Sequence, residues 1–228
     1  AQLVEAFEDF ERESSLLAAV LYGEGGNFCA GADLKAMSRC DLDTVNSLDS
    51  DMSRPGPMGP SRTRTSKPVI AAVSGYAVAG GLELACWCDL RVVERDAVFG
   101  VFCRRYGVPL IDGGTQRLPR LIGMSRALDM ILTGRPVSGE EALVMGLANR
   151  IVERGKAREE AEALALQIAA HPQSCMRSDR QSVYRGFDLS MEEAMDLEFR
   201  LGMEVIAGGE LQAGAKKFSQ GIGKHGRF

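Results

Sequence analysis

Two short glycine-bearing segments hold the residues whose types and spacing suggest chemistry. They are 28–33 (Phe-Cys-Ala-Gly-Ala-Asp) and 75–83 (Gly-Tyr-Ala-Val-Ala-Gly-Gly-Leu-Glu). Each places a small residue where a backbone N–H can approach a ligand without obstruction. The second segment runs directly into a helical pattern that carries the carboxylate of Glu83. Two N–H donors aimed at a developing negative oxygen, with an acid/base group nearby, would form an oxyanion hole.

Each segment also fits a plainer interpretation. Alone, either is typical of an ordinary turn, and the pair Gly80-Gly81 also fits close packing of a helix on a strand. Glu83 lies in the first turn of a helix that begins near Gly80. There the helix dipole favours the ionised carboxylate while burial opposes it. Such a carboxylate can hold or deprotonate water, and the alternative role is a structural acid at the helix start.

Short buried strands followed by helices must position these segments. Continuous apolar runs predict strands, because parallel strands buried on both faces lack polar alternation. The predicted strands are 16–22, 68–73, 90–93 and 97–99. A helix is expected at 81–87, after the glycine pair. The polar segment 41–67, in which prolines and glycines cluster, predicts a long loop.

Beyond Gly113-Gly114 the chain is predicted to be almost wholly helical. Ser138 and Ser190 each precede a glutamate by three residues, which matches the capping-box pattern of a helix start. Apolar and charged residues alternate at helical spacing over 157–170 and 191–206. These features predict an α/β fold with a core at residues 1–134 and a helical C-terminal module at residues 135–228.

Composition excludes several classes of function. A chain of 228 residues can bury a sizeable core, and its net charge of −4 gives no reason to expect nucleic acid or an acidic membrane as partner. No apolar run approaches the roughly 20 residues that span a bilayer. The six cysteines form no CxxC pair and have no histidine at ligand spacing. We therefore expect thiols in a reducing cytoplasm and no metal site.

Several blocks, in order along the chain, resemble the crotonase (enoyl-CoA hydratase/isomerase) superfamily. They are Phe28-Cys-Ala-Gly-Ala-Asp-Leu-Lys35, residues 67–84, Asp112-Gly-Gly-Thr-Gln-Arg-Leu118, and residues 133–142 with Gly146-Leu147. The resemblance implies a spiral of repeated strand-strand-helix turns, whose C-terminal helices pack against neighbours in a homotrimer or a dimer of trimers. Members usually start with a strand pair and an Asn-rich loop that contributes to the coenzyme A pocket. These N-terminal strands are expected to be missing here.

The resemblance also implies a substrate and a site. The substrate is an acyl-CoA thioester, which brings coenzyme A with it, and no other cofactor is implied. The two oxyanion donors are the N–H groups of Ala32 and Gly80, and Glu83 matches one of two catalytic glutamates. Further substrate-binding candidates are Ala30, Asp33, Leu34, Gly81, Tyr76 and Lys224. Tyr76 also fits a core aromatic residue. The basic tail with Lys224 either contacts coenzyme A phosphates or solubilises the chain end.

The position of the second catalytic glutamate holds Cys103. A thiol with a pKa of about 8.5 is mostly protonated at neutral pH, and the loss of one general acid/base costs roughly 10²–10⁴-fold in rate. Asp112 is a candidate substitute, with capping of the next helix as the alternative. A nucleophilic role for Cys103 would need a local histidine, and His171 and His225 lie elsewhere in the chain.

The sequence therefore predicts an acyl-CoA enzyme of the enoyl-CoA hydratase/isomerase type. One hypothesis is hydration of a 2-enoyl-CoA through Glu83, with Asp112 as partner. Another is a different enolate reaction in the same site, such as isomerisation, decarboxylation or thioester hydrolysis. The third is an acyl-CoA-binding protein without activity, for which Cys103 is the main sequence evidence.

Overall fold

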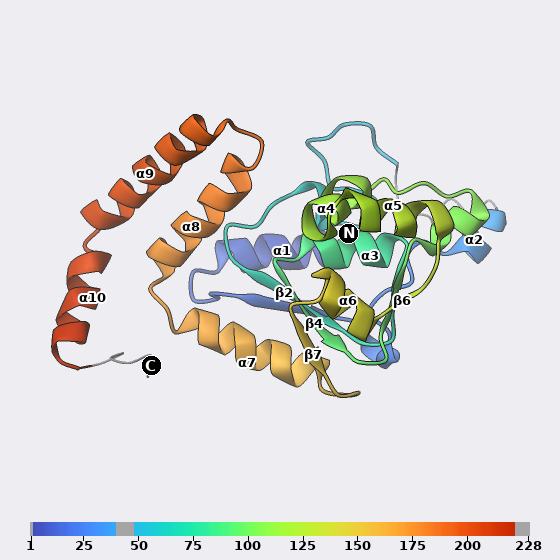
Figure 1. The fold of residues 1–228 in the computed structure, drawn as a ribbon, viewed down its shortest axis with the longest axis horizontal. Helices are drawn as coiled ribbons and strands as arrows, with labels where there is room; N and C mark the ends of the chain where they lie inside the picture. Colours follow the sequence, from blue (N-terminus) through green and yellow to red (C-terminus); the bar gives the residue numbers. More distant parts are fainter. Residues whose placement is uncertain (1, 40–47, 222–228) are drawn as a thin grey trace. The chain divides into compact units, whose positions relative to one another are not determined.

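The strands form two small sheets. The computed structural model describes residues 2–39 and 48–221 (Figure 1). The first sheet is parallel, in the order β1-β2-β4-β7, formed by Ala19–Tyr22, Val69–Val73, Leu90–Glu94 and Arg150–Val152. The second has the order β3-β5-β6, formed by Tyr76–Val78, Val98–Gly100 and Val137–Ser138. In it, β3 and β5 are parallel and β6 is antiparallel to β5. The predicted α/β class is confirmed.

Consecutive strands alternate between the two sheets before a helix follows. β2 belongs to the first sheet and β3 to the second, and helix α3 (Gly80–Trp87) comes next; β4 and β5 repeat this order before α4 (Gly114–Ile122). This is the predicted strand-strand-helix turn. The apolar run of β2 is buried at every position, which explains why it reads as continuous rather than alternating.

The remaining helices lie mostly beyond Gly114, in the part of the chain that was predicted to be helical. In chain order they are α1 (Gln2–Arg12), α2 (Leu34–Ser38), α5 (Met124–Thr133), α6 (Gly139–Met145), α7 (Ala157–Ala169), α8 (Gln173–Gly186), α9 (Met191–Ala207) and α10 (Glu210–Ser219). Both predicted helix starts are confirmed. The hydroxyl of Ser138 accepts the N–H of Glu141, and Ser190 forms a complete capping box with Glu193.

The predicted loop is partly described. Residues 40–47 lie outside the described residues, and from residue 48 the chain runs to a short 3₁₀ turn at Pro60–Arg62. Just before this turn, Gly56 and Gly59 exchange two backbone hydrogen bonds of 2.9 Å. The tight turn between them carries Met58. Two further 3₁₀ turns lie at Glu24–Gly26 and Phe102–Tyr106.

The chain divides into two compact units, Ala1–Leu166 and Gln167–Phe228. The division falls later than the sequence-based boundary between residues 134 and 135, because β6 pairs with β5 and β7 pairs with β4. Residues 135–152 therefore complete the sheets of the first unit. In the second unit, α8 and α9 lie side by side (Figure 1). Across the described ranges, no helix is long and apolar enough to cross a membrane.

Candidate active site

The two glycine-bearing segments lie side by side in the structure. The N–H of Cys29 donates to the carbonyl of Tyr76, and the N–H of Val78 donates to the carbonyl of Cys29, both at 3.0 Å. These bonds bring Ala32 next to the start of α3. A Cβ atom placed on Gly31 would lie only 3.0 Å from the nitrogen of Gly80. The pairing of the segments, expected from the sequence, is thus present in the fold.

Two backbone N–H groups are available at this junction. Within residues 2–39 and 48–221, the N–H groups of Ala32 and Gly80 donate to no other group of the protein. Gly80 is the first residue of α3, where N–H groups have no partner inside the helix and the positive end of the dipole favours anions. The preceding Ala79 has a φ of 53°, the one positive φ among the described non-glycine residues. Such a backbone is strained for alanine and is commonly found at functional sites.

Each glycine here has its own geometric reason. Gly31 has a φ of +84°, and its missing side chain keeps the approach to the Gly80 nitrogen open. A Cβ on Gly81 would lie 2.0 Å from the carbonyl oxygen of Cys29, so Gly81 permits close packing of α3 on the first segment. A Cβ on Gly80 would lie 2.7 Å from the sulfur of Met58. The predicted substrate-binding residue Gly81 is therefore buried and packs against protein.

Glu83 is buried one turn into α3, with 2% of its surface exposed. One oxygen, Oε1, accepts the N–H groups of Asp112 at 2.9 Å and Gly114 at 2.8 Å. Burial raises the pKa of the Glu83 carboxyl, and these two donors partly offset the rise. A Cβ on Gly114 would lie 2.8 Å from Cγ of Glu83, so only glycine leaves room for the carboxylate there. Two backbone N–H groups therefore hold this carboxylate, and among the described residues no lysine or arginine side chain is bonded to it.

The side chain of Asp112 anchors the loop that contains Met58 and Ser61. Its buried carboxylate oxygen Oδ1 accepts the N–H of Met58 at 2.9 Å and the hydroxyl of Ser61. Arg117 joins the same elements, donating to the carbonyls of Asp112 at 2.8 Å and Ser61 at 2.7 Å. Asp112 therefore touches Glu83 through its own N–H, while its side chain anchors Met58 and Ser61.

Cys103 is the one buried residue of the 3₁₀ turn after β5. Burial raises the pKa of its thiol, and the negative charge of Glu83 raises it further. The thiol therefore stays neutral at pH 7, which disfavours a thiolate nucleophile. The next two side chains, Arg104 and Arg105, donate to the carbonyls of Ile131 and Gly134 at the end of α5.

The sequence model of a family described as enoyl-CoA hydratase/isomerase matches residues 1–221. The chain belongs to this family. The predicted crotonase superfamily is thereby confirmed, and with it the class of an enoyl-CoA hydratase-like enzyme. A mevalonyl-coenzyme A hydratase of Aspergillus fumigatus is 33% identical over 92% of this chain and 77% of its own length. An enoyl-CoA hydratase of Mycobacterium tuberculosis, EchA19, is 31% identical over 96% of this chain and 82% of its own length.

Solved structures agree with this assignment. The crystal structure of an enoyl-CoA hydratase from Mycobacterium tuberculosis has a TM-score of 0.88 and 32% identity, covering 96% of this chain and 84% of that one. An enoyl-CoA hydratase subunit from Geobacillus kaustophilus has a TM-score of 0.85 and 33% identity, covering 96% and 83%. The crotonase fold predicted from the motifs is confirmed by these matches.

The other substrate-binding candidates of this enoyl-CoA hydratase/isomerase family member lie mostly at the surface. Ala30 and Leu34 are exposed on either side of the Ala32 donor. Asp33 caps α2, accepting the N–H groups of Lys35 and Ala36, and these bonds lower the pKa of its carboxyl. Tyr76 is half exposed on β3 and is not a core residue. Lys224 lies outside the described residues.

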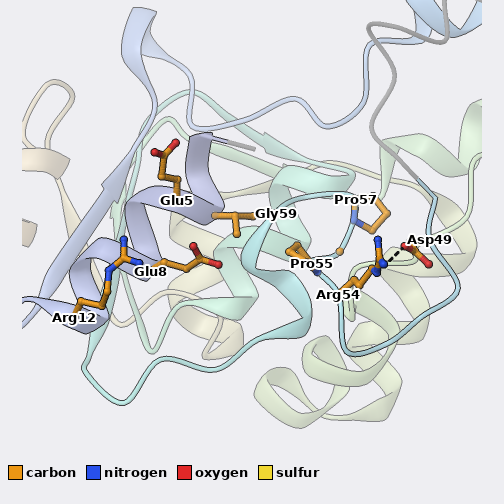
Figure 2. Close-up of a pocket in the computed structure, with 10 residues that line it drawn as sticks. Glu5, Glu8, Arg12, Asp49, Arg54, Pro55, Pro57 and Gly59 are labelled. Carbon is orange, nitrogen blue, oxygen red and sulfur yellow. Dashed lines mark ion pairs between the residues drawn. The ribbon is translucent and has the colours of Figure 1, made fainter.

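A separate pocket of about 710 Å³ opens between α1 and residues 49–59 (Figure 2). Glu5, Glu8 and Arg12 reach it from α1, while Arg54 faces it from the loop and pairs with Asp49 at 3.5 Å. None of the described lining residues is a predicted site residue. Among the described residues, no group of three or more His, Cys, Asp or Glu side chains is arranged to hold a metal ion.

Sequence reasoning missed the residues that hold the site together. Met58 and Ser61 bind the carboxylate of Asp112 from 54 and 51 positions away, and Arg117 donates to the carbonyl of Ser61, 56 positions away. Nothing in the Pro/Gly-rich segment marks Met58, because a loop residue has no periodicity to indicate its partner. Gly31 lay inside the first segment, and its φ of +84° explains why glycine stands there.

Proposed function

We propose that this protein binds an acyl-CoA thioester and stabilises its enolate with the N–H groups of Ala32 and Gly80. The observation that carries the proposal is the junction of the two segments, where both N–H groups lack a protein acceptor within the described ranges. Glu83 lies three residues after Gly80, on the same side of α3, and its carboxylate is able to move a proton. Each such N–H donor typically contributes about 2.7–4 kcal/mol to stabilising the transition state.

The reaction we favour is hydration of a 2-enoyl-CoA. The ionised Glu83 accepts a proton from water while the water oxygen bonds to C3 of the substrate. The electrons of the C2–C3 double bond move towards the thioester carbonyl, which gives the enolate. Glu83 then returns the proton to C2, so the carboxylate is regenerated. The raised pKa of Glu83 supports this role, because a more basic carboxylate removes a proton more readily.

Asp112 enters this proposal as a positioning residue. Its carboxylate is already bonded to Met58 and Ser61, whereas its N–H donates to Glu83. We therefore assign the proton transfers to Glu83 alone and propose that Asp112 orients it.

Cys103 supports a second candidate, another enolate reaction such as double-bond isomerisation. Moving a proton between two carbons of an acyl-CoA needs one base, and Glu83 is the carboxylate beside a neutral thiol. A panel of 2-enoyl, 3-enoyl, malonyl-type and saturated acyl-CoA esters separates these reactions by product. Binding of the esters without turnover would instead indicate an inactive acyl-CoA-binding protein.

The second unit supports the proposal of a homotrimer or a dimer of trimers. Met191, Met195, Phe199 and Met203 recur every four residues along α9, and each is more than 40% exposed. A row of exposed apolar residues on one helix face is typical of an interface. We also propose a cytoplasmic location. The described cysteines are all free thiols, with Cys86, Cys88 and Cys103 buried, Cys29 half-buried and Cys175 exposed.

The decisive experiment is turnover of a short 2-enoyl-CoA by the full-length protein, followed as loss of the conjugated thioester absorbance. Glu83→Gln should lower kcat by about 10²–10⁴-fold, because Gln keeps the acceptor oxygen but removes the base. The matched control is Glu94→Gln. Glu94 is also a buried glutamate, and its Oε1 accepts the N–H of Gly155 at 2.8 Å outside the site.

The outcomes separate the hypotheses. Loss of turnover in Glu83→Gln, but not in Glu94→Gln, supports hydration through Glu83. Equal turnover in Glu83→Gln and the wild type contradicts the proposed role of this carboxylate. Absence of turnover in the wild type, with acyl-CoA binding retained, contradicts hydration and leaves the other two hypotheses.

A further inference from the structure

The side chain of Met58 lies against Gly80, in the space that a Cβ atom on Gly80 would need. If Gly80 carried a Cβ atom, it would lie 2.7 Å from Sδ, 3.0 Å from Cγ and 3.3 Å from Cε of Met58. The thioether therefore fills the volume next to the backbone whose N–H is a proposed oxyanion donor. The side chain is half-buried and packs against the apolar core, so one side contacts protein and the rest is accessible.

The backbone of Met58 is held at the other end of the site. Its N–H donates to Oδ1 of Asp112, and the N–H of Asp112 donates to Glu83. Met58 thus connects two groups of the proposed site: its side chain lies against Gly80, and its backbone is linked through Asp112 to the carboxylate of Glu83. In the proposed binding mode, an acyl group whose carbonyl meets the N–H of Gly80 lies beside the side chain of Met58.

The turn that presents Met58 is fixed on both sides. Gly56 and Gly59 exchange two hydrogen bonds around it, and Ser61 shares the carboxylate of Asp112. A Cβ on Gly56 would lie 2.9 Å from Asp112 Oδ1, so the turn is packed directly on its anchor. Because the turn is anchored in this way, Met58 keeps its position when a substrate binds. A turn without these bonds would move aside for a longer acyl chain.

We infer that Met58 is the residue that limits acyl-chain length at this site, because its thioether fills the space beside Gly80 into which a longer acyl chain would extend. The inference rests on the proposed function, since it takes the acyl-CoA site as given. It goes further in naming the substrate class, short-chain acyl-CoA thioesters, and the residue responsible. Removing the thioether opens volume next to Gly80, and a hydrophobic pocket discriminates by about 10–200-fold for each methylene that it cannot accommodate.

The test compares Met58→Ala with the wild type on butenoyl-, octenoyl- and dodecenoyl-CoA. We expect Met58→Ala to raise the ratio of kcat/KM for dodecenoyl-CoA over butenoyl-CoA by at least about tenfold. Met58→Leu is the volume-conserving control and should leave the ratio close to that of the wild type. Met130→Ala, which truncates a fully buried methionine of α5, controls for lost stability and should not change the ratio.

A second readout does not depend on turnover. The affinities for butanoyl-, octanoyl- and dodecanoyl-CoA are measured at equilibrium for the same variants, with the same shift expected towards long chains in Met58→Ala. If the wild type binds these esters but turns over no enoyl-CoA, the proposed reaction fails while the affinities still test Met58. An unchanged chain-length preference in Met58→Ala, or no binding of any ester by the wild type, overturns the inference. Met58→Val carries the same test if Met58→Ala does not fold.

Discussion

Helices α3 and α9 differ in composition and in burial: α3 is apolar except for Glu83, whereas α9 carries an apolar row among charged residues. α3 buries every residue from Gly81 to Trp87, whereas Leu197 is the one buried residue of α9. A helix that is apolar on all sides belongs inside a core, and one with an exposed apolar row needs another surface. The first unit therefore fixes the candidate catalytic helix by itself, while the second unit presents an apolar face that its own residues leave uncovered.

The two helices are also anchored differently. At the C-terminal end of α3, the buried guanidinium of Arg91 donates to the carbonyls of Ala85 and Cys88, where positive charge complements the helix dipole. α9 is fixed at its start by the exposed capping box of Ser190 and Glu193. Internal anchoring suits a helix that must hold Gly80 and Glu83 in one geometry. A surface cap suits a helix that remains available to a partner.

Within this comparison of α3 and α9, the largest expected effect comes from blocking the start of α3. Gly31→Ala should lower kcat by about 10²–10³-fold, because the new Cβ would lie 3.0 Å from the Gly80 nitrogen and occupy the space where an oxyanion must sit. The measurement is steady-state turnover of a 2-enoyl-CoA, with thermal unfolding recorded beside it.

Gly25→Ala is the matched control for Gly31→Ala. Gly25 has a similar φ, +79° against +84°, but a Cβ there would meet no atom within 4 Å. Both variants therefore introduce comparable backbone strain, and Gly31→Ala alone obstructs the donor. Equal losses of turnover in the two variants would show that strain, and not access to the Gly80 N–H, limits the reaction.

Much of the fold followed from local patterns in the sequence. The apolar runs marked the strands, since β2 is buried throughout, and the serine-glutamate spacing marked the starts of α6 and α9. The pairing of β7 with β4 was not predicted, and this pairing explains why the first compact unit extends beyond residue 134. Periodicity reveals the buried face of an element but not the strand that it pairs with.

The candidate site also contains residues that local motifs predicted and contacts that they did not predict. The motifs predicted Ala32, Gly80 and Glu83, and the fold brings all three to one junction. The part played by Asp112 was missed, because its bonds to Met58 and Ser61 join residues 54 and 51 positions apart. Long-range partners of this kind leave no spacing rule in a single sequence. The side chains of Arg104 and Arg105 likewise bind carbonyls at the end of α5, a role that their sequence neighbours did not indicate.

A smaller effect is expected from the exposed face of α9. Phe199→Glu should weaken self-association at least about tenfold, because a charge would replace an aromatic side chain at the centre of the proposed interface. The measurement is sedimentation velocity over a range of protein concentrations. Glu198→Gln, at the neighbouring polar position, should leave the association unchanged. A wild-type protein that stays monomeric at all concentrations would contradict the interface and remove the contrast with α3.

The smallest effect is a pH dependence of stability from Glu83. Its folded-state pKa lies above the ordinary value of 4.5, chiefly because of burial. Between these two pKa values the folded state holds a proton that the unfolded chain has released, so the free energy of unfolding falls as pH rises through that interval. Glu83→Gln has no such proton and keeps an oxygen for the N–H groups of Asp112 and Gly114. Its thermal stability relative to the wild type should therefore be greater at neutral pH than at pH 4. A difference between the two proteins that is independent of pH would mean that the carboxylate in α3 carries no burial cost, and that the helix tolerates charge as readily as exposed α9 does.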